Sequence, residues 1–229
     1  MPDLHGYGWM LLRGLDLTLL VGFAALILAI LLGLLGAWCK LSSSAAARAL
    51  AGTYTTVVRG VPELLLILLV YYGTPTLIQN LSLRWGHPVI IDLDPFWAGS
   101  LTLGFIYGAF ATEVFRGAFQ SIPHGQIEAA RAIGMSRRLA FRRIFLPQVW
   151  RFALPGLGNV WMVLIKATAL ISVIQLDELM RSAQVAVAAT KLPFTFYFAA
   201  SLLYLGITLV SILLQQRFEA WANRGTQRA

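Results

Sequence analysis

Four long stretches of this chain contain no charged residue, and their length constrains the fold more than any other feature. They lie between Asp16 and Lys40, Glu63 and Arg84, Asp94 and Glu113, and Lys191 and Arg217. Each is about as long as the roughly 17–25 residues that a helix needs to cross the hydrocarbon core of a bilayer. A fifth apolar region, 152–176, is interrupted once, by Lys166. With 58% apolar and only 12% charged residues, the chain is unlike an ordinary soluble domain.

These stretches predict an all-α integral membrane protein with five transmembrane helices. The runs are solidly apolar, whereas the strands of a membrane β-barrel alternate in polarity. The fourth helix is expected to begin irregularly, because Pro155, Gly156 and Gly158 lie near its start. We expect a Ser/Ala-rich connection over 40–52, an outer loop over 82–94 and a solvated polar turn that contains Asp177, Glu178 and Arg181. The helices are predicted at about 15–39, from the Arg59–Glu63 segment to 81, and at 95–116, 152–176 and 193–217.

The net charge of +8 follows membrane topology and gives no indication of nucleic-acid binding. Most basic residues fall in three regions that lie on the same side of the predicted membrane: Lys40, Arg48 and Arg59; Arg116, Arg131, Arg137, Arg138, Arg142, Arg143 and Arg151; Arg217, Arg224 and Arg228. The other side has Arg13, Arg84, Lys166, Arg181 and Lys191. The positive-inside rule therefore predicts an N-terminus outside and a C-terminus in the cytoplasm.

The residues give no pattern typical of an enzyme or of a cofactor site. There is no Gly-x-x-x-x-Gly-Lys-Ser/Thr loop to hold a nucleotide phosphate, so the chain is not expected to bind ATP. The histidines His5, His87 and His124 are scattered, and Cys39 is the only cysteine. The sequence shows no nucleophile–base constellation. We therefore expect no catalytic residue, no metal and no cofactor in this chain.

A polar, arginine-rich segment, 128–147, lies between the third and fourth apolar regions. Pro123 can open a first helix, Gly134 can end it, and Ser136 can cap a second helix that Pro147 would stop. The pattern predicts a helix, a bend and a second helix with arginines beside an apolar face. One interpretation places this amphipathic element flat on the anionic inner leaflet. The other interpretation is a protruding element that docks in a groove of a cytoplasmic partner.

The spacing of seven residues in this segment resembles the EAA loop of permease subunits in binding-protein-dependent ABC importers of the MetI-like superfamily. The seven are Glu128, Ala129, Ala130, Gly134, Ile144, Leu146 and Pro147. Four further motifs resemble the polar amino acid subfamily: Arg59–Glu63, Gly104–Phe110, Thr112–Ala118 and Ala153–Gly156. The resemblance is strongest to the Q-type permease subunits of histidine/lysine/arginine/ornithine and opine importers.

The resemblance implies a type I ABC importer permease fold. It implies one transmembrane permease domain over 1–229, with a cytoplasmic coupling loop at about 121–150. The chain would be a transporter subunit and not an enzyme, located in the bacterial inner membrane among its lipids. It would carry basic or polar amino acids such as histidine, arginine, lysine, ornithine or opines. The implied partners are a second permease subunit in a heterodimer, a periplasmic substrate-binding protein and two ATP-binding subunits, which would bind the ATP and magnesium.

Three polar residues are candidates for the substrate pathway. Glu113 either pairs locally with Arg116 or serves an internal cavity or a subunit contact. Lys166 either faces a substrate path or unwound backbone, or extends to the outer surface; Thr168 follows it closely. Several members of the resembling subfamily have an acidic residue directly after this lysine, where this chain has Ala167. The resemblance therefore leaves open whether this subunit or its partner permease contacts the substrate.

Overall fold

The structure is a computed structural model that describes residues 4–85 and 91–223. Within these ranges five helical stretches are long and apolar enough to cross a membrane, as predicted. They are Gly8–Leu41, Glu63–Arg84, Pro95–Gln120, Arg137–Ile174 and Pro193–Ala222. Part of the predicted outer loop, including His87, and the tail residues Arg224 and Arg228 lie outside the described residues.

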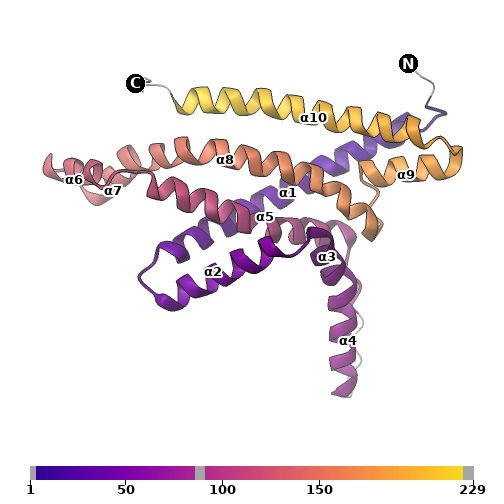
Figure 1. The fold of residues 1–229 in the computed structure, drawn as a ribbon, viewed down its shortest axis with the longest axis horizontal. Coiled ribbons are helices and arrows are strands. Elements are labelled where there is room, and N and C mark those ends of the chain that lie inside the picture. Colours follow the sequence, from indigo (N-terminus) through magenta and orange to yellow (C-terminus); the bar gives the residue numbers. More distant parts are fainter. Residues whose placement is uncertain (1–3, 86–90, 224–229) are drawn as a thin grey trace.

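Helices α1 (Gly8–Leu41) and α5 (Pro95–Gln120) pack along each other and form the centre of the molecule (Figure 1). Small residues let the two backbones approach closely. A Cβ added to Gly33 would lie only 2.6 Å from the Cβ of Ala111. Helix α8 (Leu146–Ala167) packs against α5, and α10 (Pro193–Ala222) packs against α8. Close contact through small residues is the usual way in which helices associate within a membrane.

Most of the predicted connection over 40–52 lies between the first two spans, but it is a helix, α2 (Ala45–Gly60), which the sequence did not indicate. Ser44 caps α2, because its hydroxyl accepts a hydrogen bond from the N–H of Ala47. The helix turns back along α1 and α5 and buries a short apolar face. This 16-residue helix is too short, and has too many polar residues, to be recognised from hydropathy as a membrane span. Because α2 runs back along α5, Arg59 near its end lies against Phe110, well away from either end of α5. The sequence had placed Arg59 in a connection between spans.

The fourth span is longer than the sequence predicts. It joins α7 (Arg137–Ala140), the π-helical turn η2 (Phe141–Phe145), α8 and the 3₁₀ segment η3 (Thr168–Ile174). Pro147 does not stop this helix, because it lies in the first turn of α8, after a π-helical turn that changes the hydrogen-bond register. Pro155 is also accommodated inside α8, so the expected irregular start is wrong.

A further helix, α9 (Leu179–Thr190), follows the predicted polar turn. It packs against α1 and α10 and buries Leu179, Ala183 and Ala186. Glu178, at its N-terminus, is 0% exposed, although Asp177 beside it is exposed. The prediction of a solvated turn is therefore wrong for Glu178.

The second span consists of α3 (Glu63–Leu68), the π-helical turn η1 (Leu69–Gly73) and α4 (Thr74–Arg84). Its α4 part projects away from the other helices (Figure 1). Leucines such as Leu77 and Leu81 are exposed along it. A long exposed apolar surface of this kind is typical of contact with lipid or with another protein.

Candidate functional site

The polar segment between the third and fourth spans forms a bent pair of helices at one end of the molecule (Figure 1). Its first arm is α6 (His124–Ala132), and its second arm begins with α7 and continues through η2 into α8. We call residues 124–147 the elbow. Both arms of the predicted helix–bend–helix are present, but the second arm is continuous with the fourth span.

The bend of the elbow depends on Gly134, which has a φ of +82°. The N–H of Gly134 donates to the carbonyl of Arg131 at 2.9 Å, and the N–H of Met135 donates to the carbonyl of Ala130 at 3.0 Å. These two bonds make a Schellman motif, which satisfies the last carbonyls of the first arm. A left-handed backbone costs an ordinary L-residue roughly 1–2 kcal/mol, so glycine suits this position.

The second arm begins directly after the bend. The hydroxyl of Ser136 accepts a hydrogen bond from the N–H of Leu139 at 3.3 Å, which confirms the predicted cap. Only four residues, from Ile133 to Ser136, therefore lie between the end of α6 and the start of α7. A connection this short leaves the two arms little freedom to change their angle.

Side-chain contacts hold the elbow against the ends of α5 and α8. The amide of Gln148 donates to the side-chain carbonyl of Gln126, which links the two arms. The ring of Phe145 stacks on Phe119 of α5, with the ring centroids 5.9 Å apart. Stacked aromatic pairs contribute about 0.5–1.5 kcal/mol beyond the burial of their area. A force applied to the elbow would therefore pass directly into α5 and α8.

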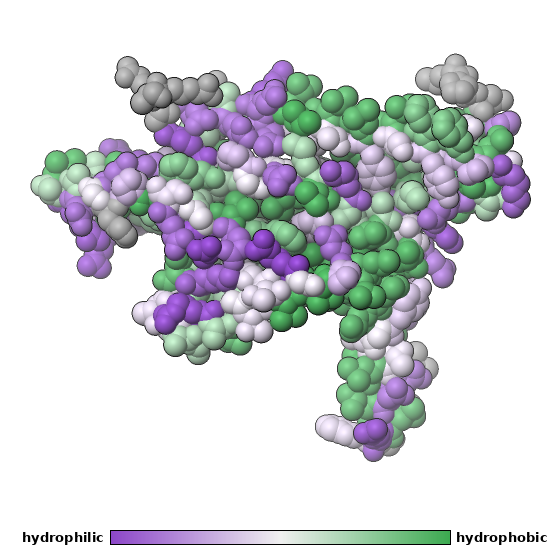
Figure 2. All heavy atoms as spheres, viewed as in Figure 1, coloured by the Kyte–Doolittle hydropathy of each residue, from purple (hydrophilic) through white to green (hydrophobic). Residues whose placement is uncertain are grey.

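The outer surface of the elbow combines apolar and cationic side chains. Ile133, Leu139 and Phe141 are exposed, with Ile133 exposed to 74%. Five arginines surround them and are exposed as well: Arg131, Arg137, Arg138, Arg142 and Arg143. Figure 2 shows hydrophobic and hydrophilic residues side by side at this end of the molecule. An apolar helix face with a cationic rim is suited to insertion in a groove of another protein.

All seven residues of the resembling motif lie in the elbow, but they differ in exposure. Glu128, Ala129, Gly134 and Pro147 are exposed, Ala130 is buried, and Ile144 and Leu146 are half-buried. The buried and half-buried members shape the elbow and attach it to the body. The exposed members are accessible to a partner.

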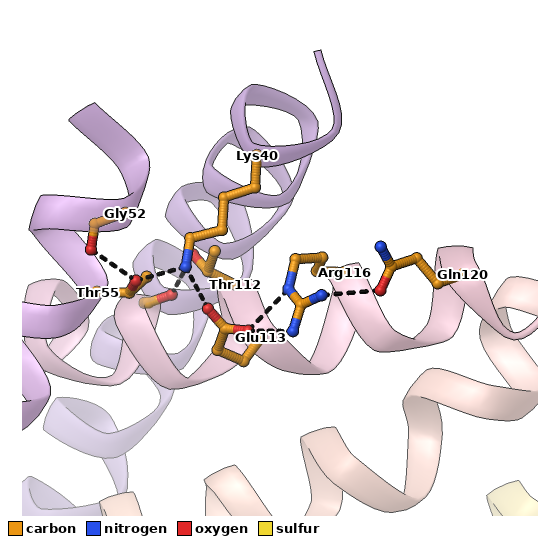
Figure 3. Close-up of polar contacts among 8 residues, drawn as sticks. Lys40, Gly52, Thr55, Thr112, Glu113, Arg116 and Gln120 are labelled. Carbon is orange, nitrogen blue, oxygen red and sulfur yellow. Dashed lines mark hydrogen bonds and ion pairs between the residues drawn. The ribbon is translucent and has the colours of Figure 1, made fainter. Parts of the chain in front are cut away.

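Glu113 takes part in the local ion pair that was one of its two predicted roles (Figure 3). Its carboxylate pairs with Arg116 at 2.8 Å and, in addition, with Lys40 at the end of α1. Lys40 also donates to the hydroxyl of Thr55 in α2 at 2.6 Å, and Arg116 donates to Gln120 at 2.8 Å. This network joins α1, α2 and α5. The pairing with Lys40 is not predictable locally, because 73 residues separate the partners.

The other two pathway candidates do not join Glu113. Lys166 is exposed, whereas Thr168 is fully buried. The hydroxyl of Thr168 donates to the carbonyl of Ile165 at 2.7 Å and lies 3.5 Å from the hydroxyl of Tyr204. The contacts of Thr168 are thus those of a packed helix end and share no partner with the Glu113 network.

Glu178 is a buried carboxylate that sequence analysis missed. It accepts hydrogen bonds from the N–H groups of Met180 and Arg181, both at 2.8 Å, and from the hydroxyl of Tyr204 at 3.2 Å. Burial raises the pKa of Glu178, whereas these donors act in the opposite direction. A signal was present, since an acidic residue directly before an apolar helix can cap it. Glutamate is not among the favoured capping residues, so this signal is weak.

Comparison with known proteins places the chain among membrane transport subunits. The family model "Binding-protein-dependent transport system inner membrane component" matches residues 15–224. The octopine transport system permease protein OccQ of Rhizobium radiobacter is 46% identical, over 99% of this chain and 95% of that protein. The histidine/lysine/arginine/ornithine transport system permease protein HisQ of Salmonella typhimurium is 43% identical, over 96% of this chain and 98% of that protein.

The fold is similar to that of known transporters. A chain from the crystal structure of an amino acid ABC transporter superposes with a TM-score of 0.79 at 32% identity, over 93% of this chain and 94% of that one. A chain of the MetNI methionine ABC transporter in an inward-facing conformation has the same fold, with a TM-score of 0.74 at 17% identity. The family match covers nearly the whole chain, and the relatives match it end to end. This chain therefore belongs to the family of inner membrane components of binding-protein-dependent transport systems.

Proposed function

We propose that this chain is a permease subunit of an ABC importer for basic amino acids or opines. The observation that supports this most strongly is the full-length similarity to permeases of octopine and of histidine/lysine/arginine/ornithine transport systems. The chain would form part of the path through a bacterial inner membrane. It would work with a second permease subunit and a periplasmic substrate-binding protein.

Energy would enter through the elbow. We propose that Glu128, Ala129, Ala130, Gly134, Ile144, Leu146 and Pro147 belong to a coupling element that docks on one of two ATP-binding partner subunits. The exposed apolar residues with their cationic rim support this role. ATP and magnesium would be bound by those partners. When the partners close on ATP, the elbow would move with them, and α5 and α8 would follow because Phe119 and Phe145 connect them.

This mechanism requires the elbow to face the cytoplasm, which the charge distribution favours. A reporter fused after Ala229 tests the orientation. A phosphatase that folds only outside the cytoplasm should be inactive at this position, and a fluorescent protein that folds only in the cytoplasm should be bright. The reverse pair of signals would show that the elbow lies on the wrong side for an ATPase.

Uptake of labelled amino acids tests the transport function. Proteoliposomes that contain this chain with its partner permease, ATP-binding subunits and binding protein should accumulate labelled arginine, histidine or octopine when ATP is present. Unlabelled substrate in excess should abolish the signal, and omission of ATP serves as the control. A complete importer that accumulates none of the three compounds, yet hydrolyses ATP, would contradict the proposed substrate class.

A further inference from the structure

Helix α2 ends and α3 begins beside the middle of α5. The two helices are separated by Val61 and Pro62, which have extended backbones. Directly after this break, Glu63 accepts a hydrogen bond from the hydroxyl of Tyr107 at 3.0 Å. Tyr107 lies at the midpoint of the 26-residue α5 and is 1% exposed. The carboxylate of Glu63 is therefore placed deep in a membrane span, where an ionisable group is costly unless it has a function.

A positive charge, that of Arg59 in α2, lies against α5 one turn beyond Tyr107. The guanidinium of Arg59 lies over the ring of Phe110, 5.0 Å from its centroid. The rings of Phe110 and Tyr107 are stacked, with centroids 5.6 Å apart. Arg59 and Glu63 are therefore held on one face of α5 by two aromatic side chains that are three residues apart. Residues with this spacing lie about 5–6 Å apart on a helix.

The two charges are not neutralised by each other. The ion pairs found within 4.0 Å among the described residues both involve Glu113, with Lys40 and with Arg116. Arg59 is exposed and Glu63 is half-buried, so both can be reached by a small molecule. This arrangement differs from that of Glu113, whose charge is already compensated.

A polar open pocket of about 470 Å³ leads away from the break. Its lining runs from Arg59, Gly60 and Phe110 to Lys40 at the end of α1 and Glu113 of α5. Figure 2 shows hydrophilic residues gathered in this region, between α5 and α2, beside hydrophobic surface. Arg59 lines this pocket, whereas Glu63, four residues further along the chain, is not among its lining residues.

We propose that Arg59 and Glu63 form a subsite that binds the two ends of a zwitterionic amino acid in transit. Arg59 would bind the carboxylate of the substrate, since a guanidinium recognises a carboxylate with two parallel hydrogen bonds. Glu63 would accept hydrogen bonds from the ammonium group. Tyr107 and Phe110 are positioning residues that hold the two charges apart. This inference rests on the proposed function.

The subsite also gives this chain an acidic contact that does not depend on helix α8. Helix α8 has Ala167 directly after Lys166 and offers no carboxylate there. Glu63 offers a carboxylate from a different helix. The chain would thus contact the substrate itself, in place of leaving this contact to the partner permease.

Direct binding to the complete importer, purified in detergent without its binding protein, tests the subsite. The probes are labelled arginine and agmatine, which lacks the carboxylate; histidine and histamine replace them for a histidine importer. Arg59→Gln should weaken arginine binding at least about tenfold and leave agmatine binding within about twofold. Glu63→Gln should weaken both probes about tenfold, because both carry the amine. The matched controls are Arg13→Gln and Asp16→Asn, two exposed residues of α1, which should change neither.

The outcomes separate this subsite from the proposed function. Equal loss of arginine and agmatine binding in Arg59→Gln would indicate structural damage and overturn the carboxylate assignment. Unchanged binding in both variants, or a wild-type importer that transports arginine without binding it, would overturn the subsite alone. A wild-type importer that neither binds nor transports an amino acid would overturn the function as well. If Glu63→Gln does not assemble, Tyr107→Phe should weaken both probes several-fold, and unchanged binding would overturn the proposal.

Discussion

Gly134→Val should reduce ATP-driven uptake to the background of an importer without ATP, while the chain still inserts and assembles in the membrane. A valine has no low-energy conformation at a φ of +82°. The backbone would rotate to relieve the strain, and the two Schellman hydrogen bonds from Gly134 and Met135 would be lost. Left-handed strain of roughly 1–2 kcal/mol, with about 1 kcal/mol for each bond, exceeds what a short bend can absorb without a change of angle.

The loss should come from geometry and not from the size of the new side chain. A Cβ added to Gly134 meets no atom within 4 Å, so the space is open. Gly125, in the first arm, is also exposed and also has open space, but it has no positive φ. Gly125→Val is therefore the matched control and should retain most of the uptake. Gly134→Asn should be intermediate, because asparagine tolerates the left-handed region better than other residues with a side chain.

Uptake and ATPase activity measured together in proteoliposomes give the result. Gly134→Val should show little uptake, and ATP hydrolysis should no longer rise when the loaded binding protein is added. Full uptake by Gly134→Val would exclude the bend as part of the coupling path. Equal losses in Gly125→Val and Gly134→Val would indicate that the first arm is merely intolerant of valine.

The spans and the bend could be predicted because their causes are local. A solidly apolar, charge-free run long enough to cross a bilayer forms a transmembrane helix, because a helix satisfies its own backbone hydrogen bonds in lipid. The bend follows from Gly134 and Ser136, whose backbone preferences act within a few residues. Both features are therefore present in the sequence before any tertiary contact forms.

The features that were missed depend on contacts between distant residues. Helix α2 is only partly apolar, and packing against α1 and α5 stabilises it where hydropathy gives no signal. Glu63 resembles an ordinary first-turn acid in the sequence, and only its contact with Tyr107 places it deep in a span. Pro147 was expected to stop a short helix, and Pro155 to make the start of the fourth span irregular. A membrane helix tolerates them because neighbouring helices and local π or 3₁₀ adjustments compensate for the lost hydrogen bonds.

Glu178→Ala should markedly lower the thermal stability of the importer. The carboxylate joins three parts of the chain: it caps α9, accepts from Tyr204 of α10 and lies 3.5 Å from the hydroxyl of Thr18 in α1. Thr18 in turn accepts from the N–H of Leu179 at 3.1 Å. An alanine would remove the acceptor of two backbone N–H groups and of one hydroxyl, all in part-buried contacts.

Each buried donor left without a partner costs about 1–3 kcal/mol, so we expect a loss on the order of 3–5 kcal/mol. For a chain of this size that corresponds to a fall in melting temperature of about 10 °C. Thermal unfolding of the purified importer in detergent measures it. Asp177→Ala is the matched control, because Asp177 is the neighbouring acid and is exposed; its melting temperature should change by no more than about 2 °C.

The conservative variant distinguishes the cap from the charge. Glu178→Gln keeps one acceptor oxygen for the N–H groups of α9 and loses the negative charge. If hydrogen bonding to the cap is the main contribution, this variant should recover about half of the stability that Glu178→Ala loses. A Glu178→Ala importer that melts within 2 °C of the wild type would show that α9 is held by its apolar face alone. In that case Leu179, Ala183 and Ala186, packed on α1 and α10, would be sufficient to hold the helix.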